Sequence, residues 1–243
     1  MIPAEVEITA DKVVQIDSSI NPKFSPSNDY LLVEITDSIQ LFQVRKLIEQ
    51  YYSEVKNPVV IRGVGRGLVS SLTLYHLFKT EKLDTDIFCI GSTFKALIDQ
   101  KKEDTGIQLV LFHSPPSESS DQDISYPKIS QDQTISVTLN NDEPGFFARS
   151  DYLLIELYGA ARMFRLKRQI LDYIRKNKAP VVFRAVGYKG IPISVRLAEM
   201  LKREGRKSEQ IIDTFSAIIR STDPLSSKKE KKITGLQIVL FTP

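Results

Sequence analysis

The chain carries one pattern of apolar segments twice, in the same order. Three segments return in the second half: residues 29–35 (DYLLVEI) as 151–157 (DYLLIEL), residues 59–62 (VVIR) as 181–184 (VVFR), and residues 106–112 (GIQLVLF) as 235–241 (GLQIVLF). The first two pairs are each 122 residues apart. Blocks that recur in a fixed order indicate internal duplication, so we predict two copies of one small domain.

Each copy also has a lead-in segment. Pro22 and Phe24 return as Pro144 and Phe146 at the same distance of 122 residues. The stretches further upstream alternate like edge strands, over residues 12–16 and 133–139. A chain of 243 residues has room for two domains of about 100 residues. We therefore predict a first repeat over residues 11–113, an acidic linker rich in Ser and Pro over 114–132, and a second repeat over 133–243.

Hydrophobic periodicity predicts the element order β-α-β-α-β-β in each copy. In the first copy we predict a strand over 30–36, a helix over 39–55, a strand over 58–62, a helix near 68–82, and strands over 86–94 and 106–112. The last two strands form a hairpin with a polar tip over residues 99–104. In the second copy we predict helices near 161–177 and 191–204 and final strands near 209–219 and 233–241. This order predicts the α+β fold class.

The first predicted helix has one apolar face and a defined end. Leu41, Val44, Ile48 and Tyr51 recur at helical spacing. Pro58 then follows, and the residue before a proline disfavours the α conformation, so the helix ends near residue 55.

Positive charge is concentrated in the second copy. Residues 147–243 hold 20 Lys and Arg against 9 Asp and Glu, an excess of eleven. Residues 29–112 hold 10 against 11, and the rest of the chain holds 3 against 10, so the total of +3 conceals a basic half. Such an excess favours a polyanionic partner, because each phosphate that a cation neutralises releases condensed counterions. The alternative is that the cations only solvate helix faces.

The basic residues of the second copy fall on three features. Three arginines spaced by three share the first helix. Two cations flank the glycine-containing turn before the second helix, whose N-terminus can present N–H groups to a phosphate. Four lysines occupy the predicted hairpin tip. We predict that these residues bind nucleic acid: Arg162, Arg165, Arg168, Arg184, Lys189, Lys228, Lys229, Lys231 and Lys232.

The first copy has a diluted version of this pattern. Its turn holds Arg62 and Arg66, and its hairpin holds Lys101 and Lys102 between acidic residues. Its first helix follows Asp37 and has no basic residue before position 45. We expect these four cations to contribute less to phosphate binding, and we expect this copy to be the one that meets a protein partner.

The turn before the second helix resembles the Alba superfamily. Residues 59–68 (VVIRGVGRGL) carry the likeness, and residues 181–191 carry it more loosely. Together with the element order and the basic hairpin, the resemblance covers both repeats. The C-terminal domain of bacterial translation initiation factor three has a similar order of elements, so topology alone leaves that alternative open.

The resemblance implies a fold, a pairing and a ligand. Alba-like proteins bind double-stranded DNA and RNA, usually as dimers, and relatives serve in chromatin, in translation control and in ribonucleases P and MRP. This chain then looks like an Alba dimer fused into one polypeptide, with the repeats paired through two apolar helix faces: Leu68, Leu72 and Leu77 on one side, Ile191, Val195 and Met200 on the other. The family's basic turn residue maps to Arg66 and, after a one-residue insertion, to Lys189. Its lysine pair before the first helix has no match in the first copy, and Arg162 and Arg165 are the nearest substitutes in the second.

The sequence holds no recognisable catalytic or metal-binding pattern. One cysteine and two histidines cannot form a zinc site of the usual kind, and hydrolase and nucleotide-binding motifs are absent. We therefore predict no enzyme activity, no metal and no cofactor. Cys89 lies in an apolar run and is predicted to be a buried thiol. Glu34 and Glu156 alternate with apolar strand residues and are predicted to face solvent.

The lack of a recognisable export or membrane signal favours a location inside the cell. No apolar run approaches the roughly 20 residues that cross a bilayer. Residues 1–10 lack the basic-then-apolar pattern of a signal peptide. A single cysteine cannot form an internal disulfide, which fits a reducing compartment. We predict a protein of the nucleus or cytoplasm without membrane contact.

Two functional hypotheses follow. The first is a non-enzymatic DNA- or RNA-binding protein that recognises shape and backbone rather than base sequence. The second is a protein-interaction scaffold in a ribonucleoprotein of the ribonuclease P/MRP type or in a chromatin complex. The nearly neutral first copy and the acidic linker favour the second hypothesis.

Overall fold

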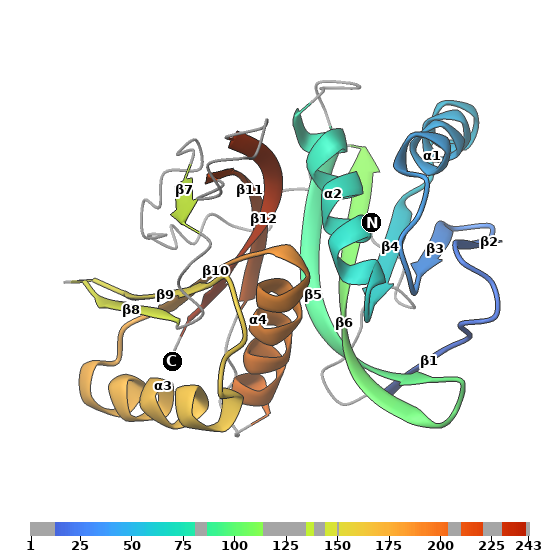
Figure 1. Ribbon diagram of the computed structural model, residues 1–243. Coiled ribbons are helices and arrows are strands. Elements are labelled where there is room, and N and C mark those ends of the chain that lie inside the picture. Colours follow the sequence, from blue (N-terminus) through green and yellow to red (C-terminus); the bar gives the residue numbers. More distant parts are fainter. Residues whose placement is uncertain are drawn as a thin grey trace, which may run out of the picture. The chain divides into compact units, whose positions relative to one another are not determined.

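The computed structural model describes residues 13–80, 87–113, 135–138, 144–149, 151–203, 210–220 and 230–241 (Figure 1). The chain divides into two compact units, Met1–Ser125 and Tyr126–Pro243. The described residues form four α-helices and two six-stranded sheets that mix parallel and antiparallel pairs. The predicted α+β class is confirmed.

Unit 1 has its elements in the predicted order, preceded by two short strands. They are β1 (Val13–Ile16), β2 (Lys23–Pro26), β3 (Leu31–Ile35), α1 (Leu41–Val55), β4 (Val59–Val64), α2 (Gly67–Thr80), β5 (Ile87–Ile98) and β6 (Lys102–His113). The sheet order is β1-β5-β6-β4-β3-β2. Strands β3 and β4 are parallel neighbours connected through α1, and β4 is antiparallel to β6.

Unit 2 repeats this arrangement. Its elements are β7 (Ile135–Thr138), β8 (Gly145–Ala148), β9 (Leu153–Leu157), α3 (Met163–Asn177), β10 (Val181–Val186), α4 (Gly187–Lys202), β11 (Gln210–Arg220) and β12 (Glu230–Leu240). The sheet order is β7-β11-β12-β10-β9-β8. The upstream strands β1 and β7 lie at sheet edges and pair in parallel with β5 and β11, so the edge-strand prediction is confirmed.

The first helix of each unit forms where the apolar periodicity predicts it. In α1, Val44 and Ile48 are buried, and the helix ends at Lys56, which adopts a left-handed conformation and donates its N–H to the carbonyl of Tyr52. In α3, Leu166, Ile170 and Ile174 are buried at matching positions. Each first helix contacts the second helix of its unit, and the second helix packs across the central strands. Both helices of a unit therefore cover the same face of its sheet.

Two glycines fix the position of the second helix. A Cβ on Gly67 would lie 1.9 Å from the carbonyl oxygen of Ile35, and a Cβ on Gly190 would lie 2.0 Å from that of Leu157. Only glycine permits this approach of the helix to the end of the preceding parallel strand. The equivalence of these two glycines agrees with a one-residue insertion in the turn of the second repeat. The turn prediction for unit 2 was wrong in one respect, because α4 begins at Gly187 and already includes Lys189 in its first turn.

Three of the four hairpin strands, β5, β6 and β12, are longer than predicted, whereas the 11 residues of β11 match the predicted length. In unit 1 only residues 99–101 lie between them, and Asp99 and Gln100 have positive φ, as a tight hairpin turn requires. Lys102 therefore begins strand β6 instead of lying in a loop. In unit 2, Lys231 and Lys232 belong to strand β12. In unit 1 the strands extend because residues 95–98 pair with residues 102–105 up to the turn.

Candidate nucleic-acid interface

One end of the second sheet gathers the basic side chains. Strands β9 and β10 are parallel, so their carboxyl ends lie at the same edge, and α3 and α4 each begin after one of them. The contact between Gly190 and the Leu157 carbonyl brings the start of α4 against the end of β9. Arg162 at the start of α3 and Lys189 in the first turn of α4 therefore belong to one edge, and both are exposed.

The long hairpin of unit 2 reaches beyond the same edge. Strand β10 ends at Val186, which pairs with Gly235 of β12. Because the two strands are antiparallel, residues 230–234 of β12 continue past the end of β10, over about 17 Å at roughly 3.4 Å per residue. Lys232 is exposed on this extension. Residues separated by an even number share one side of a strand, so Lys232 lies on the same side of β12 as Leu236 and Ile238, which are buried on the side that α4 covers.

Three arginines continue this surface along α3. Arg162 is the N-cap residue of the helix, and Arg165 and Arg168 follow at intervals of three, all exposed. Within the described part of the chain, none of the three forms an ion pair. At the opposite end of the helix, by contrast, Arg175 lies 3.5 Å from Asp172. We call Arg162, Arg165, Arg168, Lys189 and Lys232 the basic end.

Two predicted phosphate ligands are largely covered and hydrogen-bonded within the sheet instead. Arg184 is 9% exposed, and its Nε donates to Oε1 of Gln237 at 3.0 Å. In unit 1 the Nε of Arg62 donates to Oε1 of Gln108 at 2.9 Å, and its Nη1 lies 3.7 Å from Glu34. Both arginines lie in the middle of a strand, where neighbouring strands supply their partners. The expectation that they belong to an exposed turn was wrong.

The glutamates beside these arginines also differ from prediction. Glu34 is 5% exposed, and burial raises its pKa although Arg62 and Lys23 favour the charged form. Burial likewise lowers the pKa of Arg62. In unit 2, Glu156 is half-buried, and burial together with this carboxylate raises the pKa of Tyr158. The solvent-facing prediction is wrong for Glu34, which lies between its cross-strand neighbours Lys23 and Arg62, and only partly met for Glu156, whose neighbour on β8 is Gly145.

Unit 1 lacks an equivalent basic end. Gln40 and Gln43 occupy the positions of Arg162 and Arg165, 122 residues earlier. Arg66 is exposed but lies 4.0 Å from Asp37. Lys101 and Lys102 are exposed beside Glu103. The two copies therefore differ in net charge and also in their cations: those of unit 1 lie beside acidic residues, whereas the arginines at the start of α3 do not, among the residues that the structure describes.

Some predictions fall outside the described residues. Lys228, Lys229 and the linker over 114–132 lie there. Lys231 is described only by its place in β12, and Cys89 only by its place in β5. The candidate interface therefore consists of the remaining cations.

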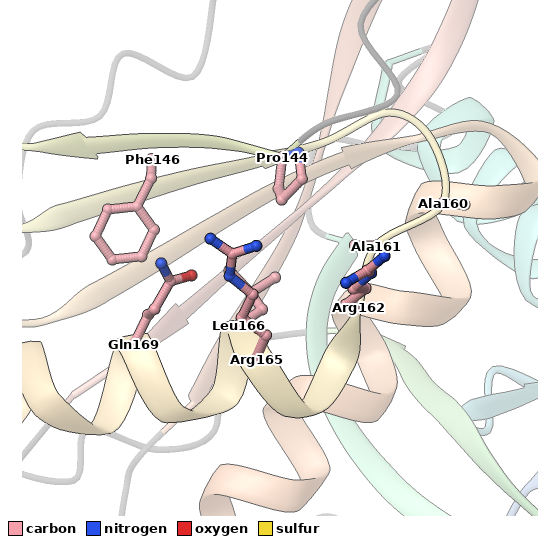
Figure 2. A pocket seen from close by; sticks show the side chains of 8 residues that line it. All are labelled: Pro144, Phe146, Ala160, Ala161, Arg162, Arg165, Leu166 and Gln169. Atoms are coloured by element: carbon pink, nitrogen blue, oxygen red, sulfur yellow. The ribbon is translucent and has the colours of Figure 1, made fainter.

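A pocket of about 410 Å³ lies beside the basic end, between β8 and α3 (Figure 2). Phe146 points from β8 toward the helix, and Arg165 and Gln169 project from α3 toward the strand. Arg162 lines the pocket near residues 160–161, at the start of the helix. An aromatic ring, two guanidinium groups and a carboxamide thus share one cavity.

Sequence reasoning missed the aromatic and amide residues of this region. Phe146 is 41% exposed, and Phe164 on α3 is 78% exposed. Phe164 has a counterpart in Phe42, 122 residues earlier and 79% exposed, so its recurrence was a signal available in the sequence. Gln169 gave no such signal, because its counterpart is Leu47.

Comparison with models of protein families gives no match to this chain, and comparison with curated proteins gives none either. Among the helices of the described ranges, none combines the length and the apolar character that a membrane span requires. A search of the same ranges for three or more His, Cys, Asp or Glu side chains arranged around a metal ion finds no such group.

Proposed function

We propose that this protein binds DNA or RNA through the basic end of unit 2, gripping the sugar-phosphate backbone without catalysing a reaction. The observation that carries the proposal is the convergence of three elements at one sheet edge. The start of α3, the start of α4 and the extension of β12 each bring exposed cations to that edge.

The physical argument is electrostatic. Arginine binds phosphate oxygens through two parallel N–H groups, and lysine adds a point charge. Each neutralised phosphate releases condensed counterions, so several cations on one surface give substantial affinity without reading bases. The excess of eleven positive charges in residues 147–243 raises the potential around this surface.

We also propose that the two units are an Alba-like pair within one chain. The support is the common element order of both units and the close approach of a glycine at the start of each second helix. In this proposal unit 2 holds the nucleic acid, and the second helices of the two units pair through their apolar faces. Light scattering should give the mass of one chain, and a mass of two chains would argue for pairing between molecules instead.

A paired substitution tests the binding proposal. Arg162→Gln with Arg165→Gln installs the residues that unit 1 carries at the same positions, which this fold already tolerates. Arg175→Gln with Lys176→Gln removes two cations from the far end of the same helix as a matched control. With fluorescent duplex DNA and RNA, the first variant should bind at least tenfold more weakly than the native chain, at roughly 1 kcal/mol per lost phosphate contact.

The control variant should bind within about twofold of the native chain, since its cations lie about 20 Å along the helix from Arg162. Equal losses in both variants would show that the attraction is diffuse. An unchanged affinity in the first variant would contradict the proposal.

A protein-interaction role is a second candidate for unit 1. Helix α1 exposes Phe42 (79%), Leu47 (51%) and Val55 (46%), and it lacks the arginines of α3. Exposed apolar side chains of this size are typical of surfaces that meet a protein. Recovery of a stoichiometric protein partner that Phe42→Ser abolishes would favour this role, provided that the Phe164→Ser variant retains the partner.

A further inference from the structure

The pocket between β8 and α3 has a shape that backbone binding does not require. Contacts to phosphates need only exposed cations on a surface. Here, however, an aromatic ring and a carboxamide line a cavity together with two of those cations (Figure 2). Its volume of about 410 Å³ lies within the range of roughly 300–1,000 Å³ that is common for small-ligand pockets.

The register of the sheet explains how the pocket forms. Strand β8 is the edge strand and pairs with β9, so that Phe146 lies opposite Ile155 and Phe147 opposite Leu154. Leu154 belongs to an apolar cluster with Val182 and Val239, and no helix residue belongs to that cluster. Side chains alternate along a strand, so Phe146 faces α3 while Phe147 faces the other way. The ring of Phe147 instead covers Gly145.

The lining matches the parts of a nucleotide. A flat aromatic ring provides a stacking surface for a base, and this contact is available to every base. The amide of Gln169 can donate and accept hydrogen bonds along a base edge. Arg162 and Arg165 can hold the adjoining phosphate. The three groups are complementary to one unpaired nucleotide and not to a base inside a duplex, whose faces are covered by its neighbours.

We propose that this pocket accepts a single unpaired nucleotide, extruded from a duplex or present in a loop, with its base against Phe146 and its phosphate against Arg162 and Arg165. The proposal rests on the proposed nucleic-acid function and deepens it. According to this proposal, the protein prefers nucleic acids that contain an unpaired base. The base stacks on the face of the pocket formed by β8, and Gln169 contacts its edge.

The duplication provides a natural comparison. At the equivalent positions unit 1 retains Phe24 but has Gln40, Gln43 and Leu47 in place of Arg162, Arg165 and Gln169. The aromatic platform is thus common to both copies, whereas the phosphate-binding arginines occur only in the second. We therefore assign the nucleotide site to unit 2 alone.

The experiment compares two RNA duplexes that differ by one extruded adenine, using the full chain. The native protein should bind the bulged duplex about tenfold more tightly than the fully paired one, as expected for one stacked base. Phe146→Ala should abolish this preference while leaving the affinity for the paired duplex unchanged. With 2-aminopurine at the bulge, binding should quench its fluorescence in the native chain and not in the variant.

Phe147→Ala is the matched control, since this neighbouring ring is 43% exposed but faces away from the pocket. It should keep both the preference and the quenching, and thermal unfolding of both variants checks that β8 remains folded. A corresponding pair of DNA duplexes distinguishes RNA from DNA as the source of the nucleotide, and a preference for the bulge in either supports the proposal.

Equal binding of bulged and paired duplexes by the native chain would overturn this inference. The proposed function would survive that result if Arg162→Gln with Arg165→Gln still weakened the binding of both. A loss of affinity for both duplexes in Phe146→Ala would also overturn the inference, because the ring would then act through the fold. Absence of binding to any nucleic acid would overturn both proposals.

Discussion

The salt dependence of binding follows from the number of cations at the basic end. Five exposed side chains make up this end: Arg162, Arg165, Arg168, Lys189 and Lys232. If each neutralises one phosphate of a DNA duplex, the logarithm of the association constant should fall with the logarithm of salt concentration with a slope of about −4.5. Between 50 and 200 mM salt the affinity should then fall by about 500-fold.

Each cation that is removed from the basic end should make this slope shallower by about 0.9. Arg162→Gln with Arg165→Gln leaves three cations and should give a slope of about −2.7, which corresponds to an affinity loss of only about 40-fold over the same salt range. Adding Lys189→Gln should bring the slope to about −1.8. Fluorescence anisotropy with a labelled 20-base-pair duplex at five salt concentrations measures all three slopes.

The far-end control, Arg175→Gln with Lys176→Gln, should keep the native slope of about −4.5. A native slope shallower than about −2 would refute the reasoning, because most of the five cations would then be making no phosphate contact. A slope that falls equally in the control and in the basic-end variant would also refute it, since the net charge and not the convergence of residues would then decide binding.

Three further predictions concern stability. Gly190→Ala should lower the free energy of unfolding of unit 2 by about 2–4 kcal/mol, because the new Cβ would clash with a backbone carbonyl. At Gly187 a Cβ would meet no neighbour, but the φ of +71° disfavours alanine, so Gly187→Ala should cost about 1 kcal/mol. Urea unfolding measures both. Arg184→Met should lower stability by about 1–3 kcal/mol, by leaving Gln237 unpaired, yet keep the native salt slope. Burial raises the pKa of Glu34 above its usual value near 4.5. Unit 1 should therefore lose stability as the pH rises from about 4.5 through the raised pKa, because the buried carboxyl must then ionise. Glu34→Gln should flatten this pH dependence in thermal unfolding.

The duplication and the order of elements could be read from the sequence because both depend on local patterns. Apolar residues at helical spacing placed α1 and α3, and Pro58 marked the end of the first helix. The excess of cations in the second copy is likewise a property of composition. The hairpins were underestimated, because charged residues such as Lys102 resemble a loop until their cross-strand partners are known.

The tertiary structure determines which arginines are covered within the sheet and which are exposed. Arg62 and Arg184 stand next to glycine-containing turns in sequence, yet each is held by a glutamine that lies 46 or 53 residues further along the chain. No local pattern reveals such a partner. Arg162 and Arg165 differ from them because they lie on the exposed side of a helix end, where no described strand supplies an acidic side chain.

The amino-acid sequence by itself determined that this chain is a doubled α+β unit with its positive charge in one half, since repeats, periodicity and charge are all written along the chain. Only the tertiary structure decided which cations reach the surface together and that Phe146 meets Arg165 and Gln169 across a pocket. The physical reason is that strand pairing joins residues far apart in sequence, and pairing sets both burial and neighbours.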